Sequence, residues 1–248
     1  MIYSNEPDTW QDLQQKVAEV LSVCGCESYV EHEINLVRGQ VEMDVVAFDR
    51  TRQPEIVYLC ECKYWRTPIP QSVVHSFRTI VNDFGAHFGF IISRVGFQSG
   101  AHEAAKKTNI SLVNWYDFQA LFSDRWVAGR YEQIRPELEK LFEYYDYLSA
   151  PIRNSIQGNE DRMKEYGQIL DRYKSQANIN PWNRMIGSNN FPPPLPVIIQ
   201  DDTSEGLGTE RQFKDYSSFF DWHEERTKEG LERFQGFVDR YKTGPVGT

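Results

Sequence analysis

Residues 41–63 read VEMDVVAFDRTRQPEIVYLCECK, and the expected fold class is built outward from them. Two runs of β-branched and apolar residues, Val41–Phe48 and Ile56–Cys62, are separated by the polar segment Asp49–Glu55. Short apolar runs on either side of a polar turn are typical of neighbouring strands. The stretch therefore predicts an antiparallel pair of strands.

Charged residues lie near the ends of these two strands, where they can meet. Side chains alternate between the two faces of a strand, so Glu61 and Lys63 point to one side and Cys60 and Cys62 to the other. Asp44 can approach the first pair from the neighbouring strand. We therefore expect two carboxylates and one ammonium group to gather at one place.

This combination of groups suits the hydrolysis of phosphodiester bonds. Asp44 and Glu61 offer the hard oxygen ligands that Mg²⁺ prefers, and Mn²⁺ is a plausible substitute. A bound ion offsets charge on the scissile phosphate and lowers the pKa of a water molecule. Lys63 can orient or help to deprotonate that water and stabilise the transition state. The expected catalytic set is Asp44, Glu61 and Lys63.

The chain downstream of Lys63 adds a longer pattern. A helix with a proline near its start, a buried strand, a turn into a helix and a short strand follow in order, at Ile69–Phe77, Gly89–Ser93, Gly96–Ala101 and Ile110–Val113. With Asp44, Glu61 and Lys63 as the D…(D/E)xK signature, this succession resembles the catalytic domain of Mrr-type restriction endonucleases, within the PD-(D/E)xK nuclease superfamily. The resemblance covers roughly residues 10 to 122.

The elements before the motif complete the expected fold. Residues 9–21 have apolar positions at helical spacing and are followed by Gly25 as a stop signal, with Trp10 and Leu13 expected in the core. Residues 28–37 alternate enough to form an edge strand. The order predicts an α/β sandwich with a mixed central sheet flanked by helices. The resemblance implies that this sandwich is restriction-endonuclease-like.

The resemblance also marks one departure from the family pattern. Many relatives carry a metal-binding Glu on the first helix, about eleven residues before the glycine that ends it, and counting back from Gly25 reaches Gln14. An amide is a poorer ligand for Mg²⁺ than a carboxylate. Glu42, on the same strand face as Asp44, either substitutes for the missing carboxylate or is a solvated strand residue or a partner of Arg38. Gln71 begins the next helix, where related nucleases often place polar residues near the cleft.

The charge of the chain limits how it can bind nucleic acid. The formal net charge is −9, which argues against a broad basic surface, because affinity for phosphate backbones comes mostly from clustered Lys and Arg. DNA binding must then depend on local clusters or on partners. For each candidate phosphate contact a solvated surface charge is the favoured interpretation; the candidates are Arg38, Arg50, Arg52, Arg66, Lys106 and Lys107.

Two further features bear on location and metal binding. No stretch is apolar enough to cross a membrane and the N-terminus lacks a signal-peptide pattern, so a cytoplasmic protein is expected. The cysteines form two Cys-x-Cys pairs, Cys24 with Cys26 and Cys60 with Cys62, whereas zinc sites usually show Cys-x-x-Cys spacing. For Cys60 and Cys62 small buried side chains are the favoured interpretation. Cys24 and Cys26 lie at the end of the first helix, and a four-cysteine metal site is the less favoured alternative.

The chain changes character after residue 124. We expect a nuclease domain at 1–124 and, at 125–248, a mainly α-helical region for recognition or assembly. Residues 128–148 and 161–177 are amphipathic, 178–210 is an irregular segment rich in Pro and Asn, and 212–242 is a final helix dense in aromatics. Those aromatics either pack on the earlier helices or bind a partner.

The combined reading is a metal-dependent endonuclease acting on DNA, in restriction or anti-phage defence. The alternative is a catalytically inactive nuclease-like subunit that binds nucleic acid or serves as a scaffold, which the acidic charge and Gln14 favour. The motif reads phosphates rather than bases, so RNA cleavage stays open. Cutting both strands of a duplex needs two sites, which implies a homodimer or a subunit of a defence complex.

Overall fold

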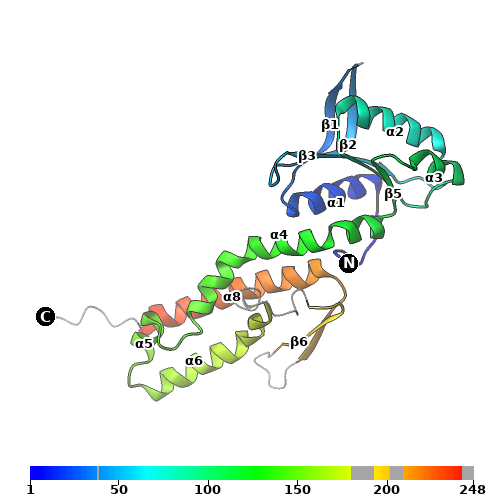
Figure 1. Cartoon of the computed structure of the whole chain (residues 1–248). Coiled ribbons are helices and arrows are strands. Elements are labelled where there is room, and N and C mark those ends of the chain that lie inside the picture. Colours follow the sequence, from blue (N-terminus) through cyan, green and yellow to red (C-terminus); the bar gives the residue numbers. More distant parts are fainter. Residues whose placement is uncertain (38, 180–192, 202–208, 242–248) are drawn as a thin grey trace. The chain divides into compact units, whose positions relative to one another are not determined.

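A computed structural model describes residues 1–37, 39–179, 193–201 and 209–241 (Figure 1). The chain forms two compact units, Met1–Arg130 and Tyr131–Thr248. The division lies inside helix α4 (Trp115–Glu143), a few residues beyond the boundary expected from composition. Each unit is described by itself.

The first unit is built on a five-stranded mixed sheet. Its strands lie in the order in which they occur along the chain, with β1 antiparallel to β2, β2 antiparallel to β3, and β3, β4 and β5 mutually parallel. Their bounds are β1 Glu27–Leu36, β2 Gly39–Asp49, β3 Ile56–Lys63, β4 Phe88–Ser93 and β5 Ile110–Val113. The predicted pair of antiparallel strands and the mixed sheet are confirmed, and β1 is an edge strand as expected.

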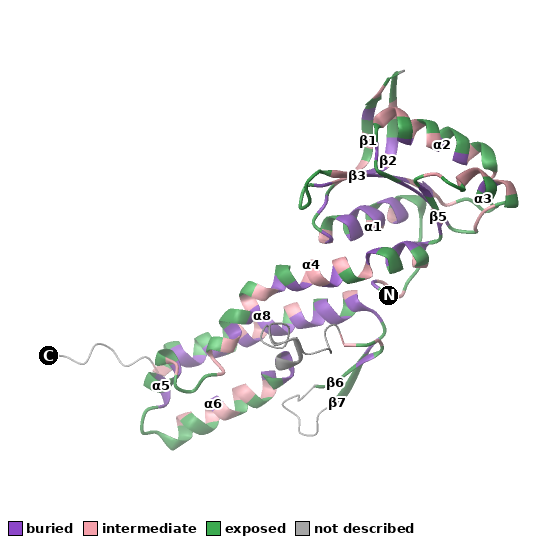
Figure 2. Ribbon diagram, viewed as in Figure 1, coloured by how far each residue is buried: buried purple, intermediate pink, exposed green. Residues whose placement is uncertain are grey.

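Helices cover both faces of this sheet (Figure 1). On one face lie α2 (Gln71–Phe84) and α3 (Ser99–Ala105), whose apolar side chains join Val46, Leu59 and Ile91 of the strands in one core. Figure 2 shows the exposed residues of α2 on its outer side, as expected for an amphipathic helix. The unit is the α/β sandwich that the sequence predicts.

The other face is covered by α1 (Trp10–Val23) and by the first half of α4. Thr9 caps α1, since its side chain accepts a hydrogen bond from the Asp12 N–H, and this fixes where the helix begins. Leu13 is buried, as predicted, but Trp10 is 46% exposed. The prediction for Trp10 is wrong. Helical spacing identifies the apolar face of a helix, but it does not show whether the first residue of that helix is covered by the rest of the fold.

A buried ion pair joins three elements of the first unit. The Asp49 side chain is fully buried at the end of β2, and its Oδ2 lies 2.9 Å from Arg125 Nη2 on α4. The same Arg125 group donates to the carbonyl of Cys24, just after α1. Burial would raise the pKa of Asp49, but hydrogen bonds from Thr51 and the charge of Arg125 outweigh it and hold that pKa below its ordinary value.

The second unit is mainly helical and has its own core. The rest of α4 is followed by α5 (Ala150–Ile156), α6 (Glu160–Tyr173), a 3-10 helix η1 (Lys174–Ile179) and α8 (Tyr216–Tyr241). Phe234 and Phe237 of α8 are buried against side chains of α4, α5 and α6. Packing within the unit, rather than exposure to a partner, is therefore confirmed for these aromatics.

Part of the segment expected to be irregular, 178–210, lies outside the described residues. Its described portion contains β6 (Val197–Asp201), which pairs with β7 (Thr209–Phe213) in an antiparallel ladder. Irregular structure was the wrong prediction for β6, because the neighbouring prolines conceal a short alternating strand. The same ladder takes Gln212 and Phe213, so the final helix begins later than predicted, at Tyr216. Among the helices that the structure describes, none has the length and apolar character needed to span a bilayer.

Candidate active site

The candidate site lies where β2 separates from β3. The ladder between these strands ends at the pair Val45 and Cys60. One residue further along, the Asp44 side chain takes over the role of the strand backbone, because its Oδ2 accepts a hydrogen bond of 2.6 Å from the N–H of Cys62. The carboxylate therefore bridges the gap between the two strands and is held at the end of β3.

A second contact fixes the other oxygen of Asp44. Gln14 lies on α1, is 3% exposed, and donates from Nε2 to Asp44 Oδ1 over 2.7 Å. Both carboxylate oxygens are thus oriented by donors on two different elements. An aspartate restrained in this way loses little further freedom when it binds a cation.

Lys63 connects the two carboxylates at the end of β3. Its Nζ forms an ion pair with Glu61 Oε1 and lies 4.0 Å from Asp44 Oδ2. All three side chains are between 18% and 24% exposed, so solvent and a ligand can reach them. Burial and the nearby charge of Asp44 raise the pKa of Glu61 above its ordinary value, although Lys63 opposes this rise. The site therefore holds two carboxylates that repel each other and one cation between them.

The sheet is distorted beside Asp44. In the ladder between β1 and β2, the pairs on both sides of Glu31 and Asp44 are formed, whereas these two residues are not paired. Glu31 has a φ of 49°, in the left-handed region that residues other than glycine rarely adopt. Strained backbone of this kind concentrates at functional sites. Glu31 was missed in the sequence because nothing in a strand pattern signals a positive φ at a glutamate.

A comparison of the sequence with models of known families matches the part of the chain that carries this site. The family model for the Mrr catalytic domain, described as "Restriction endonuclease", matches residues 8–122. Residues 8–122 are an Mrr-type restriction endonuclease domain. The match contains α1, the whole sheet and the three residues of the signature, so the resemblance inferred from the motif is confirmed.

The other comparisons add little to this nuclease domain. No curated protein matches the sequence. One solved structure, the crystal structure of a protein of unknown function, AF1548, is similar with 14% sequence identity and a TM-score of 0.37, covering 92% of this chain and 100% of that one.

Other residues predicted for the nuclease site lie around it with fewer contacts. Glu42 is exposed on β2 and is paired across the ladder with Glu33. Gln71 is the first residue of α2, and its side chain lies against Gly100 at the start of α3. Arg66 is exposed in the segment between β3 and α2. Their roles at the site stay predictions, and Arg38 lies outside the described residues.

Four of the basic residues are not brought to the site. Lys106 and Lys107 follow α3 and precede β5, at the opposite end of the parallel strands from Lys63, and Lys106 pairs with Glu103 at 2.7 Å. These two lysines lie far from Lys63 because β5 runs parallel to β4, a direction that the local sequence does not reveal.

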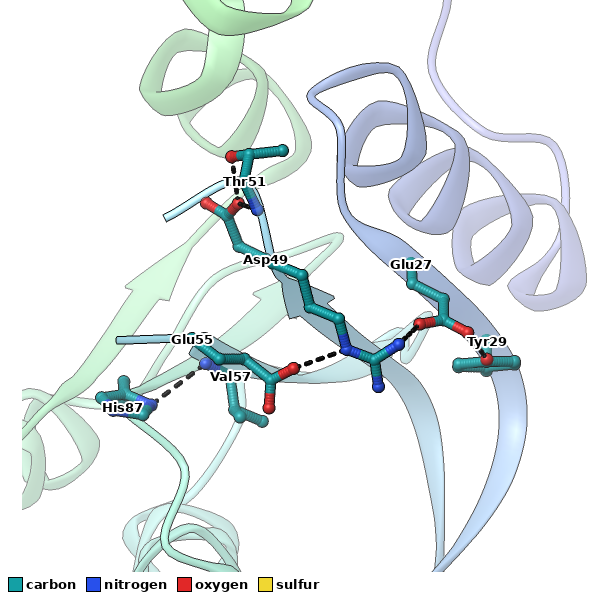
Figure 3. Close-up of polar contacts among 8 residues, drawn as sticks. Glu27, Tyr29, Asp49, Thr51, Glu55, Val57 and His87 are labelled. Carbon is teal, nitrogen blue, oxygen red and sulfur yellow. Dashed lines mark hydrogen bonds and ion pairs between the residues drawn. The ribbon is translucent and has the colours of Figure 1, made fainter. Parts of the chain in front are cut away.

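Arg50 and Arg52 lie in the turn between β2 and β3, a full strand length away from Lys63. Arg50 is held there by ion pairs with Glu27 and with Glu55, the latter at 2.7 Å (Figure 3). An arginine engaged with two carboxylates at this end of β3 is not positioned to contact a phosphate at Lys63.

Two aromatic residues directly after the signature were not singled out in the sequence. Trp65 is 43% exposed, and Lys63 Nζ lies 5.8 Å from the centroid of its ring. Tyr64 donates a hydrogen bond to the carbonyl of Asp8 over 2.8 Å. Aromatic residues directly after a D…(D/E)xK motif can therefore lie beside the catalytic lysine.

The donor set of the site fits a hard divalent cation. Mg²⁺ is usually bound through one or two carboxylates, with water and substrate phosphates in the remaining positions, and Asp44 and Glu61 are two such carboxylates. Among the residues that the structure describes, no group of three or more His, Cys, Asp or Glu side chains is arranged to hold a metal. An ion at this site would therefore depend on the phosphate of the substrate for further ligands.

The cysteines of the nuclease domain belong to its interior. All four are buried and free of disulfides. Burial raises the pKa of the Cys24 thiol to about 12 and that of Cys26 to about 11. Thiols that stay protonated to such high pH are poor nucleophiles. They pack as small apolar side chains, in agreement with the favoured reading of the sequence.

Proposed function

We propose that the protein is a Mg²⁺-dependent endonuclease that hydrolyses DNA phosphodiester bonds, with Asp44 and Glu61 as metal ligands and Lys63 as the catalytic lysine. The observation that carries the proposal is the convergence of the three side chains, since Lys63 Nζ contacts both carboxylates at the end of β3. That convergence occurs within residues matched to a restriction endonuclease domain.

Each residue of the site has a task in this reaction. Asp44 is oriented by Gln14 and by the N–H of Cys62, so it presents a fixed oxygen ligand. Bound Mg²⁺, or Mn²⁺ in its place, would supply Lewis acidity toward the phosphate and lower the pKa of a water molecule. Lys63 orients the attacking water and stabilises the negative charge that develops on the phosphate oxygens.

The wider role that fits this activity is restriction or anti-phage defence in the cytoplasm, with the second unit serving recognition or assembly. A single site cuts one strand in one event, so cleavage of both strands requires a homodimer or another subunit of a defence complex. The acidic net charge of −9 supports dependence on a partner or on local contacts, such as Arg66, for binding DNA.

One observation favours a second candidate, a nuclease-like subunit that binds nucleic acid or acts as a scaffold without cutting. The first helix places an amide, Gln14, against Asp44, where many relatives have a carboxylate. Two carboxylates still suffice for Mg²⁺ when a phosphate completes its coordination, so we rank catalysis first.

The test is cleavage of supercoiled plasmid by the full chain with Mg²⁺, with Mn²⁺ and with EDTA. Asp44→Ala and Lys63→Ala are compared with Lys106→Ala, which removes a lysine at the opposite end of the parallel strands. We expect cutting that requires the metal, a loss of about a hundredfold or more in both site variants, and no change in the control.

Two results would contradict catalysis by this site. The first is cutting that persists in both site variants. The second is a folded protein that retards DNA in a gel but cuts neither plasmid nor single-stranded DNA nor RNA with either metal, which would support the scaffold alternative. Cleavage of RNA alone would retain the site and change the substrate.

A further inference from the structure

A small cavity lies beside the candidate active site, at the ends of the parallel strands. Its volume is about 150 Å³. It is lined by residues at or just beyond the carboxyl end of each parallel strand: Tyr64 after β3, Ser93 and Arg94 at the end of β4, and Trp115 and Tyr116 after β5. In open α/β sheets, ligands bind in the crevice outside the carboxyl ends of the strands. This position is therefore the one where a ligand is expected.

The walls of the cavity are aromatic and held in place. Trp115 is 5% exposed, and its Nε1 donates to the carbonyl of Asn5 over 3.2 Å. The Tyr64 hydroxyl donates to the carbonyl of Asp8, so the N-terminal segment restrains both rings. The Trp115 ring already stacks against Tyr3 and Phe118, so the half-buried Tyr116 is the lining residue that offers a ring to a flat aromatic ligand.

Polar groups stand at the rim of the same cavity. The Arg94 guanidinium lies 4.5 Å from the centroid of the Tyr64 ring, and it is exposed to solvent. Asn114 accepts a hydrogen bond from the N–H of Asp117, and no described residue accepts one from its side-chain NH₂ group. The cavity therefore combines the Tyr116 ring with a donor for the edge of a heterocycle, and its lining holds one carboxylate, Glu6, beside the Arg94 cation.

The backbone links the cavity directly to the catalytic strand. Tyr64 follows Lys63, and the N–H of Arg94 donates to the carbonyl of Lys63 over 3.1 Å. On α1, Leu13 lines the cavity and precedes Gln14, which binds Asp44. Two residues that line the cavity, Tyr64 and Leu13, are thus neighbours in sequence of Lys63 and Gln14, which belong to the site proposed to hold the scissile phosphate.

We propose that this cavity receives an unstacked nucleobase of the nucleic-acid strand whose phosphate is bound at Lys63. The inference rests on the proposed function, because it assigns a base-binding position to the same site. Enzymes that take a base out of the stack hold it in a close-fitting pocket between aromatic side chains. About 150 Å³ is well below the roughly 300 Å³ of pockets for drug-sized ligands, so the cavity suits a single base rather than a whole nucleotide cofactor.

The experiment measures contact and affinity without cleavage. The full chain is mixed in EDTA with single-stranded oligonucleotides of mixed sequence that carry 5-iododeoxyuridine. Irradiation crosslinks this base to the side chains it touches, and mass spectrometry of the peptides identifies them. Affinity is measured by fluorescence anisotropy for wild type, Arg94→Ala and Tyr116→Ala. The control is Arg52→Ala, which removes an exposed arginine at the other end of β3.

We expect crosslinks to Tyr64 or to the peptide containing Trp115 and Tyr116. Because stacking on one aromatic side chain contributes substantially per base, binding should weaken by about fivefold or more in Tyr116→Ala. Arg94→Ala should also weaken it, and the control should bind as wild type does. Arg94 is exposed, so its variant stays informative if Tyr116→Ala does not fold.

The outcomes separate this inference from the proposed function. Metal-dependent plasmid cleavage together with crosslinks only elsewhere and unchanged affinity in both cavity variants would overturn the inference alone. Crosslinks in the cavity without any cleavage would support it while the proposed function fails. Deoxynucleoside monophosphates that bind more tightly than the oligonucleotide would overturn the assignment to a base within a strand and indicate a free nucleotide.

Discussion

Gln14 donates a hydrogen bond of 2.7 Å to Asp44, and so a neutral amide on the first helix holds the aspartate that the proposed mechanism uses as a metal ligand. A carboxylate at position 14 would add a ligand for a cation but would lack the donor that binds Asp44. The choice of side chain at this one position therefore sets stability without metal against affinity for metal.

Gln14→Glu should destabilise the protein in EDTA and strengthen its response to metal. A buried carboxylate beside Asp44 loses the hydrogen bond and adds like-charge repulsion, so the melting temperature in EDTA should fall. A third carboxylate should bind Mn²⁺ or Mg²⁺ more tightly, so each metal should raise the melting temperature more than it does in wild type. Thermal unfolding with and without metal measures both effects.

The matched control for this variant is Gln15→Glu. Gln15 is the next residue of α1, is exposed, and bonds Glu19 rather than Asp44. It should leave the metal response unchanged. A Gln14→Glu protein that melts as wild type does at every metal concentration would show that position 14 does not face the ion.

The elevated pKa of Glu61 predicts how stability without metal depends on pH. Burial and the charge of Asp44 raise this pKa above the ordinary 4.5, so the folded chain holds the proton to higher pH than the unfolded chain does. Between 4.5 and the raised value, the native state binds more protons, and the free energy of unfolding falls as pH rises. Glu61→Gln should remove this contribution.

Urea unfolding in EDTA at several pH values compares wild type with Glu61→Gln. The difference in the free energy of unfolding between them should shift in favour of the variant as pH rises through the window. Glu103→Gln serves as the control, since Glu103 is exposed on α3 and its ion-pair partner among the described residues is Lys106. A difference that does not vary with pH would mean that Glu61 has no raised pKa.

The strands and the three signature residues could be predicted because their signals are local. Alternation along β3 places Glu61 and Lys63 on one side, and the motif spacing brings Asp44 to the same end. Gln14 was found only through the resemblance, by counting back from Gly25. Its contact with Asp44 depends on how α1 packs on the sheet, which no local pattern encodes.

Other features of the site depend on the direction and register of whole elements. Lys107 was a candidate for the site, yet the parallel direction of β5 places it at the far end of the sheet. The left-handed Glu31 and the cavity at Tyr64 arise from the way strands meet and separate. Such relations exist only after the chain has folded, so a reading of residue types could not give them.

His223 predicts that the second unit loses stability in acid. This histidine is fully buried on α8, where its Nδ1 lies 2.8 Å from Gln176 Oε1, and burial lowers its pKa from 6.5 to about 3. Below pH 6.5 the unfolded chain therefore binds a proton at His223, whereas the folded chain does not. The free energy of unfolding falls as pH decreases from 6.5 toward 3. At pH 5 the loss is about 2 kcal/mol relative to neutral pH.

The measurement is urea unfolding at pH 5 and at pH 7.5 for wild type and His223→Gln. The variant should be less sensitive to acid by about the same 2 kcal/mol, because it has no group to protonate. His102→Gln, which changes an exposed histidine on α3, should behave as wild type does. Equal acid sensitivity in His223→Gln and wild type would contradict the assignment of a buried neutral imidazole.

Gly129 predicts how closely α4 approaches the end of α1. A Cβ atom built on Gly129 would lie 1.8 Å from the carbonyl oxygen of Val23, a backbone atom that cannot rotate away. Gly129→Ala should therefore separate the helices and lower the free energy of unfolding by about 1–3 kcal/mol, the usual range for overpacking, or more.

Gly167→Ala is the matched control in α6, where a Cβ meets nothing within 4 Å among the described residues. The control should gain up to about 1 kcal/mol, because alanine is the better helix former. Urea unfolding of both variants measures the two changes, and a Gly129→Ala protein as stable as wild type would mean that the helices are farther apart than the structure shows.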